Sequence, residues 1–126
     1  MKFQTLMIIK AVVCLSLGVP ILLAPIFLYS LFGTSLNPGG VFAAREYGAS
    51  LIGNLMLTWF ARNAIESEVR RAIALGLCVY DAIGFVVTLI AQIMGVLGPL
   101  GWFAAAIYLF FAIGFGCFLL PPKKVA

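Results

Sequence analysis

Long apolar stretches alternate with short polar segments along this chain, and the pattern indicates membrane-spanning helices. A hydrocarbon core of about 30 Å needs roughly 20 helical residues to cross it. Four stretches meet that length: residues 11–32, 41–62, 72–94 and 100–120. The segments between them are rich in glycine, proline, asparagine and serine, which favour turns and loops. The pattern predicts an all-α integral membrane protein, a four-transmembrane-helix bundle that forms a single domain over residues 1–126.

Two prolines lie inside the first expected span. Pro20 and Pro25 each remove a backbone N–H donor, so each is expected to kink the helix. A signal peptide is disfavoured there, because the apolar run is longer than a typical signal core and no A-x-A cleavage pattern follows it. The first span is therefore expected to stay in the protein as a kinked helix.

Composition and charge agree with the membrane class. Hydrophobic residues make up 64% of the chain and charged residues 10%, against about 25% charged residues in soluble domains. Both termini fall on one side of four spans, and the positive-inside rule makes the cation-rich side cytoplasmic. Only Arg45 falls on the other side; the seven cations that share the side of the termini are Lys2, Lys10, Arg62, Arg70, Arg71, Lys123 and Lys124.

The predicted localisation is therefore the cytoplasmic (inner) membrane, multi-pass, with the N-terminus and the C-terminus in the cytoplasm. The net charge of +4 does not indicate nucleic-acid binding, because the cations lie where membrane topology places them. The expected partners are the lipid bilayer and a larger membrane complex or a second copy of the chain, with no nucleic acid.

Several kinds of reactive site are disfavoured by residue types. The chain has no histidine, which removes imidazole proton relays and histidine-ligated haem or zinc. Its three cysteines, Cys14, Cys78 and Cys117, form no C-x-x-C pair, so a thioredoxin-like redox site is unsupported. We expect free thiols, no cofactor, no metal site and no catalytic residue.

Polar residues follow one face of each of the two middle spans. Glu46, Ser50 and Asn54 are spaced i, i+4, i+8, and Arg45 precedes them. The third span has a similar stripe; its polar members are Asp81, Thr88 and Gln92. Because consecutive spans are antiparallel, we expect the two stripes to face each other.

Depth along the helices suggests how the stripes would pair. At about 1.5 Å per residue, Asn54 and Asp81 both lie roughly 12–14 Å from the cytoplasmic edge, so Asn54 is the predicted partner of Asp81. Arg45 and Glu46 are expected near the outer interface, as an interfacial anchor or an internal ion pair.

Asp81 has two possible roles. A carboxylate at mid-membrane costs about 2.5–3.5 kcal/mol on insertion scales, so it is expected to face the bundle interior or water. In the first role it exchanges protons at a substrate site. In the second it is a hydrogen-bonded group that sets helix register, with Asn54 as its partner.

Two segments carry a family resemblance. AREYGASLIGN at residues 44–54 and YDAIGF at residues 80–85 resemble small bacterial four-span proteins of the DoxX-like kind. The Arg-x-Tyr-Gly entry to the second span is similar to that of the fungal ergosterol-scaffold family. The resemblance covers about the middle third of the chain and implies a scaffold or accessory role, with no catalytic residue to carry over.

The leading functional hypothesis is a non-enzymatic membrane accessory or scaffold protein. Such a protein would bind a lipid-like molecule between its helices or pack against a larger membrane complex. The alternative is a small proton-coupled transporter that uses Asp81, Asn54 and Glu46. A membrane enzyme acting on a lipid or quinone is the third hypothesis.

Overall fold

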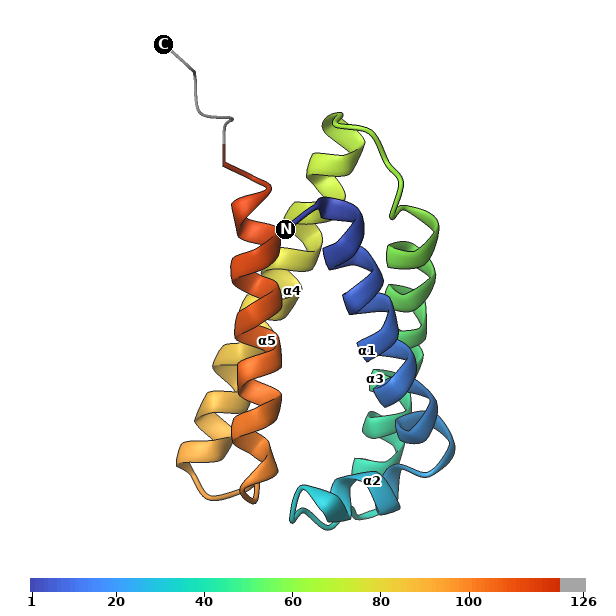
Figure 1. Ribbon diagram of the computed structural model, residues 1–126. Helices are drawn as coiled ribbons and strands as arrows, with labels where there is room; N and C mark the ends of the chain where they lie inside the picture. Colours follow the sequence, from blue (N-terminus) through green and yellow to red (C-terminus); the bar gives the residue numbers. More distant parts are fainter. Residues whose placement is uncertain (121–126) are drawn as a thin grey trace.

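The computed structural model describes residues 1–120 and shows an all-helical fold over that range, with five helices (Figure 1). They are α1 (Phe3–Leu23), α2 (Pro25–Leu31), α3 (Pro38–Phe60), α4 (Glu68–Ile93) and α5 (Leu100–Cys117). Three of them, α1, α4 and α5, are long and apolar enough to cross a membrane. Residues 121–126, which include the cations Lys123 and Lys124, lie outside the described residues.

The first apolar stretch differs from the prediction. Its helix begins at Phe3, continues through Pro20 and ends at Leu23. Ala24 leaves the helical conformation, with φ −140° and ψ 62°, and α2 starts afresh at Pro25. A proline disfavours the α conformation of the residue before it and is well suited to the first position of a new helix. One continuous kinked helix over 11–32 is therefore wrong: Pro25 divides the stretch into two helices.

The polar connections begin the next helices with side-chain caps. The Asn37 carboxamide oxygen accepts a hydrogen bond from the Gly40 N–H at 2.7 Å at the start of α3. The Ser67 hydroxyl oxygen accepts one from the Arg70 N–H at 3.2 Å at the start of α4. Each bond satisfies a backbone donor that the first helical turn leaves free.

The long helices associate as two pairs, α1 with α3 and α4 with α5. Figure 1 shows the pairs side by side and separated along much of their length. Glycines allow the first pair to approach closely: a Cβ added at Gly48 would lie 3.0 Å from the Leu22 nitrogen, and one at Gly18 would lie 3.1 Å from Leu51 Cβ. The sequence predicts that the polar stripes of residues 41–62 and 72–94 face each other; in the structure α3 packs along α1 and α4 along α5.

The two pairs meet at both ends. At the end that holds the N-terminus, side chains of α1, α4 and α5 form one apolar cluster; its buried members are Phe3, Leu6, Met7, Ala74, Leu77, Phe111 and Phe115. At the other end the Gly98 N–H donates to the Phe32 carbonyl at 2.6 Å, and the Thr34 hydroxyl donates to the Val96 carbonyl at 2.8 Å. These contacts leave the middle of the molecule as the place where a cavity can form between the pairs.

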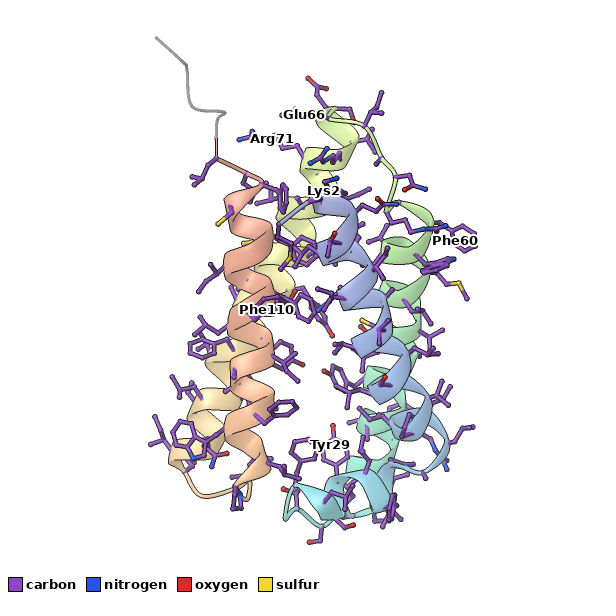
Figure 2. All side chains as sticks on the ribbon, in the orientation of Figure 1. Lys2, Tyr29, Phe60, Glu66, Arg71 and Phe110 are labelled. Atoms are coloured by element: carbon purple, nitrogen blue, oxygen red, sulfur yellow. The ribbon has the colours of Figure 1, made fainter. Side chains whose placement is uncertain are left out.

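The outer surface of the helices is apolar, and charge gathers at one end. Leu15 on α1, Ile83 on α4 and Ile113 on α5 are each half or more exposed. Figure 2 shows Lys2, Glu66 and Arg71 together at the end opposite Tyr29. An apolar girdle of this kind suits hydrocarbon better than water.

Candidate binding site between the helix pairs

A buried ion pair joins the two helix pairs. The Lys10 ammonium on α1 lies 2.5 Å from the Asp81 carboxylate oxygen Oδ1 on α4. Lys10 is 3% exposed and Asp81 0%. Two charges so far from solvent persist only when they are paired and hydrogen-bonded. The pair therefore connects α1 to α4 at the level where the apolar cluster ends.

The ion pair corrects two predictions from the sequence. Lys10 was expected among the cations of the cytoplasmic face, but it lies inside the helix bundle, because α1 begins seven residues before it at Phe3. Asn54 was expected to be the partner of Asp81, yet the Asp81 carboxylate is bonded to Lys10. Asn54 is half-buried on α3, which packs on α1 rather than on α4.

Aromatic rings surround the ammonium. The Lys10 nitrogen lies 4.6 Å from the ring centroid of Phe111 and 5.2 Å from that of Tyr80. Both distances are within the range of cation–π attraction, which stabilises a desolvated cation. The lysine charge is thus balanced by one carboxylate oxygen and two ring faces.

The carboxylate is less fully satisfied than the ammonium. Asp81 Oδ2 is buried and has no hydrogen-bond partner among the described residues. An ionised carboxylate can accept several hydrogen bonds, and an unsatisfied buried acceptor is costly. Asp81 Oδ2 is therefore an acceptor that no donor of the described residues satisfies, and it has no accessible surface.

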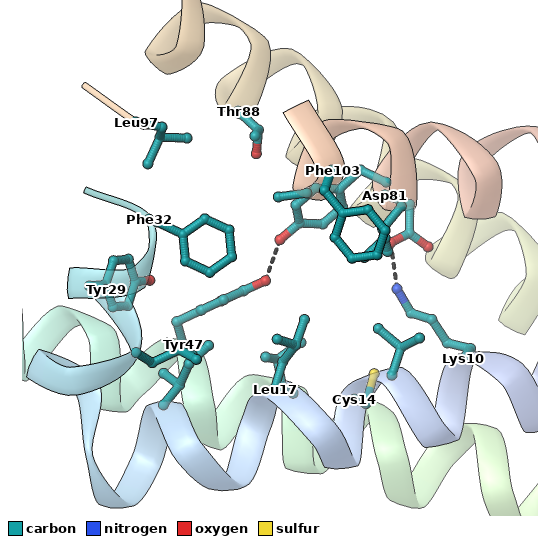
Figure 3. A pocket seen from close by; sticks show the side chains of 17 residues that line it. Lys10, Cys14, Leu17, Tyr29, Phe32, Tyr47, Asp81, Thr88, Leu97 and Phe103 are labelled. Atoms are coloured by element: carbon teal, nitrogen blue, oxygen red, sulfur yellow. Dashed lines mark hydrogen bonds and ion pairs between the residues drawn. The ribbon is translucent and has the colours of Figure 1, made fainter. Parts of the chain in front are cut away.

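A second polar contact crosses between the pairs. The Tyr47 hydroxyl on α3 and the Tyr108 hydroxyl on α5 are hydrogen-bonded to each other (Figure 3). The Tyr108 ring is held against α4, where only a glycine at position 84 leaves room for it: a Cβ there would lie 2.6 Å from its Cδ1 atom. The sequence analysis did not select these tyrosines, since only their position deep within the spans distinguished them.

Between the two contacts lies a cavity of about 210 Å³. Its wall is mostly aliphatic and aromatic and is drawn from all five helices and the α4–α5 loop (Figure 3). The polar groups on the wall are few; they belong to Lys10, Cys14, Tyr29, Tyr47, Asp81, Thr88 and Tyr108. Apolar walls with a small number of placed polar groups are typical of ligand sites.

The remaining predicted site residues divide into two groups. Thr88 lines the cavity, and Gln92 on the same face of α4 donates from Nε2 to the Gly98 carbonyl at 3.3 Å. Arg45, Glu46 and Ser50 are exposed residues of α3. Within residues 1–120 the one ion pair is Lys10–Asp81, so Arg45 and Glu46 are not bonded to each other.

The cysteines do not converge. Cys14 is buried on α1 at the cavity wall, Cys78 donates to the Ala112 carbonyl at 3.4 Å, and Cys117 is exposed on α5. In the part of the chain that the structure describes, no three histidine, cysteine or acidic side chains gather as metal ligands would.

Comparisons of the chain with protein-family models, with curated proteins and with solved structures found no match. The resemblance to DoxX-like and ergosterol-scaffold proteins stays a prediction.

Proposed function

We propose that the protein lies in the cytoplasmic (inner) membrane, that α3 is its fourth membrane span, and that both termini face the cytoplasm. Its 23 residues extend about 34 Å at 1.5 Å per residue, enough for a hydrocarbon core of about 30 Å. The helix also lies along α1, itself apolar enough to span. The cations Lys2, Arg62, Arg70 and Arg71 near the N-terminal end support the orientation.

The function that the geometry supports best is a non-enzymatic membrane accessory protein that binds a lipid-like molecule between its two helix pairs. The observation that carries this proposal is the largely apolar cavity of about 210 Å³ that lies between the two pairs. A cavity of that size far exceeds the roughly 10–15 Å³ that one water needs, and its aliphatic wall offers water few partners. An apolar chain or ring system fills such a space favourably.

Cavity-filling substitutions test the proposal. Leu17 on α1 lines the cavity, whereas Leu15 on the same helix is 50% exposed. We expect lipid to co-purify with the parent protein and with Leu15→Trp, and to be lost from Leu17→Trp, because only the second indole occupies the cavity. Mass spectrometry of gently extracted protein measures the bound lipid.

A second matched pair of variants keeps the test valid if Leu17→Trp fails to fold. Ala104 on α5 lines the cavity and Ala106 on the same helix is exposed. Ala104→Phe should lose the lipid and Ala106→Phe should keep it, with both proteins folded as judged by thermal melting. Equal lipid content in all four variants would show that the cavity is not the binding site.

The second candidate function is a small proton-coupled carrier. The observation that favours it is the ion pair of Lys10 and Asp81 at the wall of the same cavity, because intramembrane ionisable pairs often mark proton or substrate paths. Proton-linked uptake by purified protein in sealed vesicles would favour the carrier over the binding protein.

A further inference from the structure

The ion pair presents its two charges to the cavity unequally. Lys10 is covered by the Phe111 and Tyr80 rings and by Asp81 Oδ1. Asp81 lines the same cavity, is wholly buried, and has one oxygen without a partner in the described chain. The unmet requirement of this site is therefore a hydrogen-bond donor and not an anion.

The charge of the pair restricts what can supply that donor. Lys10 and Asp81 together are neutral, and in an apolar interior charges act over longer distances than in water. An anionic head group that approached Lys10 would meet the Asp81 carboxylate, and a cationic head group that approached Asp81 would meet the Lys10 ammonium 2.5 Å from it. A neutral donor avoids both repulsions.

We propose that the ligand is an uncharged lipid with a hydroxyl head group whose apolar part fills the cavity, and that the Asp81 carboxyl group, wholly buried without the ligand, turns Oδ2 toward the cavity to accept a hydrogen bond from this hydroxyl. This inference rests on the proposed lipid-binding function and names its ligand class. The Tyr47–Tyr108 pair fits a neutral ligand too, because two hydroxyls that share one hydrogen bond add polarity without charge.

The test compares three probes with the same alkyl chain: dodecanol, dodecyl methyl ether and dodecanoate. Full-length protein in phosphatidylcholine nanodiscs is melted over a range of probe concentrations, and the rise in Tm gives an apparent Kd. Leu17→Trp, whose cavity is filled, measures the part of the rise that comes from probe in the bilayer. Dodecanol should bind the parent about ten-fold or more tightly than the ether, because a hydrogen bond to a charged acceptor is lost with the donor.

The double variant Lys10→Met with Asp81→Leu removes the pair and keeps an apolar interior. Dodecanol and dodecyl methyl ether should bind this double variant equally well. Asp81→Asn, which preserves side-chain shape and removes the negative charge, is the second variant, and it too should lose most of the preference for alcohol. A preference for alcohol that survives undiminished in either variant would overturn the inference.

The outcomes for the parent protein separate this inference from the function on which it rests. Equal affinity for alcohol and ether, or tightest binding of dodecanoate, overturns the hydroxyl head group and leaves lipid binding intact. No cavity-dependent rise in Tm with any probe, together with lipid retained in Leu17→Trp and Ala104→Phe, overturns both.

Discussion

At the scale of single residues, the contact between Lys10 and Asp81 combines a structural role with a position at the wall of the cavity. The side chains come from helices of different pairs, so the contact holds α1 against α4. Charges in a bilayer interior are expensive, and their mutual attraction offsets that cost only when both are present. The energetic consequence of the pair therefore shows most clearly when one partner is removed.

Lys10→Met should destabilise the protein strongly, by about 3–5 kcal/mol, because it leaves Asp81 buried without its counter-charge. Lys10→Met combined with Asp81→Leu should recover most of that loss, since replacing a whole buried pair by apolar groups is often neutral or stabilising. Thermal or denaturant unfolding in one detergent measures both. If the double variant proves as unstable as Lys10→Met, the ion pair contributes to the stability of the fold by more than the neutralisation of two buried charges.

At the scale of helices, small residues decide which helices pack together. Gly18 and Gly48 bring α1 and α3 into close contact, and Gly84 on α4 accommodates the ring of Tyr108 from α5. Each of these contacts lies within one pair, so glycine placement explains why α1 pairs with α3 and α4 with α5. Pro25 has a different effect, because it ends one helix and begins the next.

Two glycines of α4 offer a matched comparison. Gly84→Ala should destabilise the protein by about 1–3 kcal/mol, because the new methyl group meets the Tyr108 ring, 2.9 Å from its Cζ atom. Gly76→Ala should be neutral or stabilising by up to about 1 kcal/mol, since no atom lies within 4 Å of its Cβ and alanine favours helix. Unfolding midpoints check the difference, and equal midpoints would mean that Tyr108 moves aside freely.

The Gly84 variant also tests whether helix packing affects the proposed ligand site. A displaced Tyr108 ring would lose its bond to Tyr47 and would alter the cavity wall. Bound lipid should therefore fall in Gly84→Ala and stay unchanged in Gly76→Ala.

At the scale of the whole molecule, two helix pairs joined at their ends enclose the site. An apolar cluster closes the end that holds the N-terminus. At the other end the Gly98 N–H donates to the Phe32 carbonyl and the Thr34 hydroxyl donates to the Val96 carbonyl, which joins the loops. The cavity and both polar contacts lie between these closures. This arrangement permits a ligand to lie between pairs without disrupting the packing within either.

The proposed topology gives a labelling prediction. In a protein whose three cysteines are replaced by alanine, Ser35→Cys and Glu66→Cys place single thiols in exposed loops at opposite ends of α3. A membrane-impermeant maleimide added from outside should label position 35 and not position 66, because the cation-rich end is expected in the cytoplasm. Labelling of both positions from outside would refute the four-span orientation.

The arrangement of apolar runs predicted the helices at residues 41–62, 72–94 and 100–120 to within a few residues, because helix length and hydrophobicity are local properties. Lys10 was predicted to lie just outside the first span, at the cytoplasmic face, for the same local reason. A lysine beside an apolar run is typical of a span end, and only the start of α1 at Phe3 puts it well inside a helix.

The sequence by itself determined the helical class, the apolar surface, the segregation of cations, and the presence of one acidic residue deep in an apolar stretch. The tertiary structure alone decided which cation meets that acid, since Lys10 and Asp81 are 71 positions apart and meet only because of how the pairs are joined. It also decided that Tyr47 and Tyr108 share a hydrogen bond and that a cavity lies between them and the ion pair. Periodicity reports the face of each helix, but the choice of neighbouring helix depends on close contacts between residues far apart in the chain.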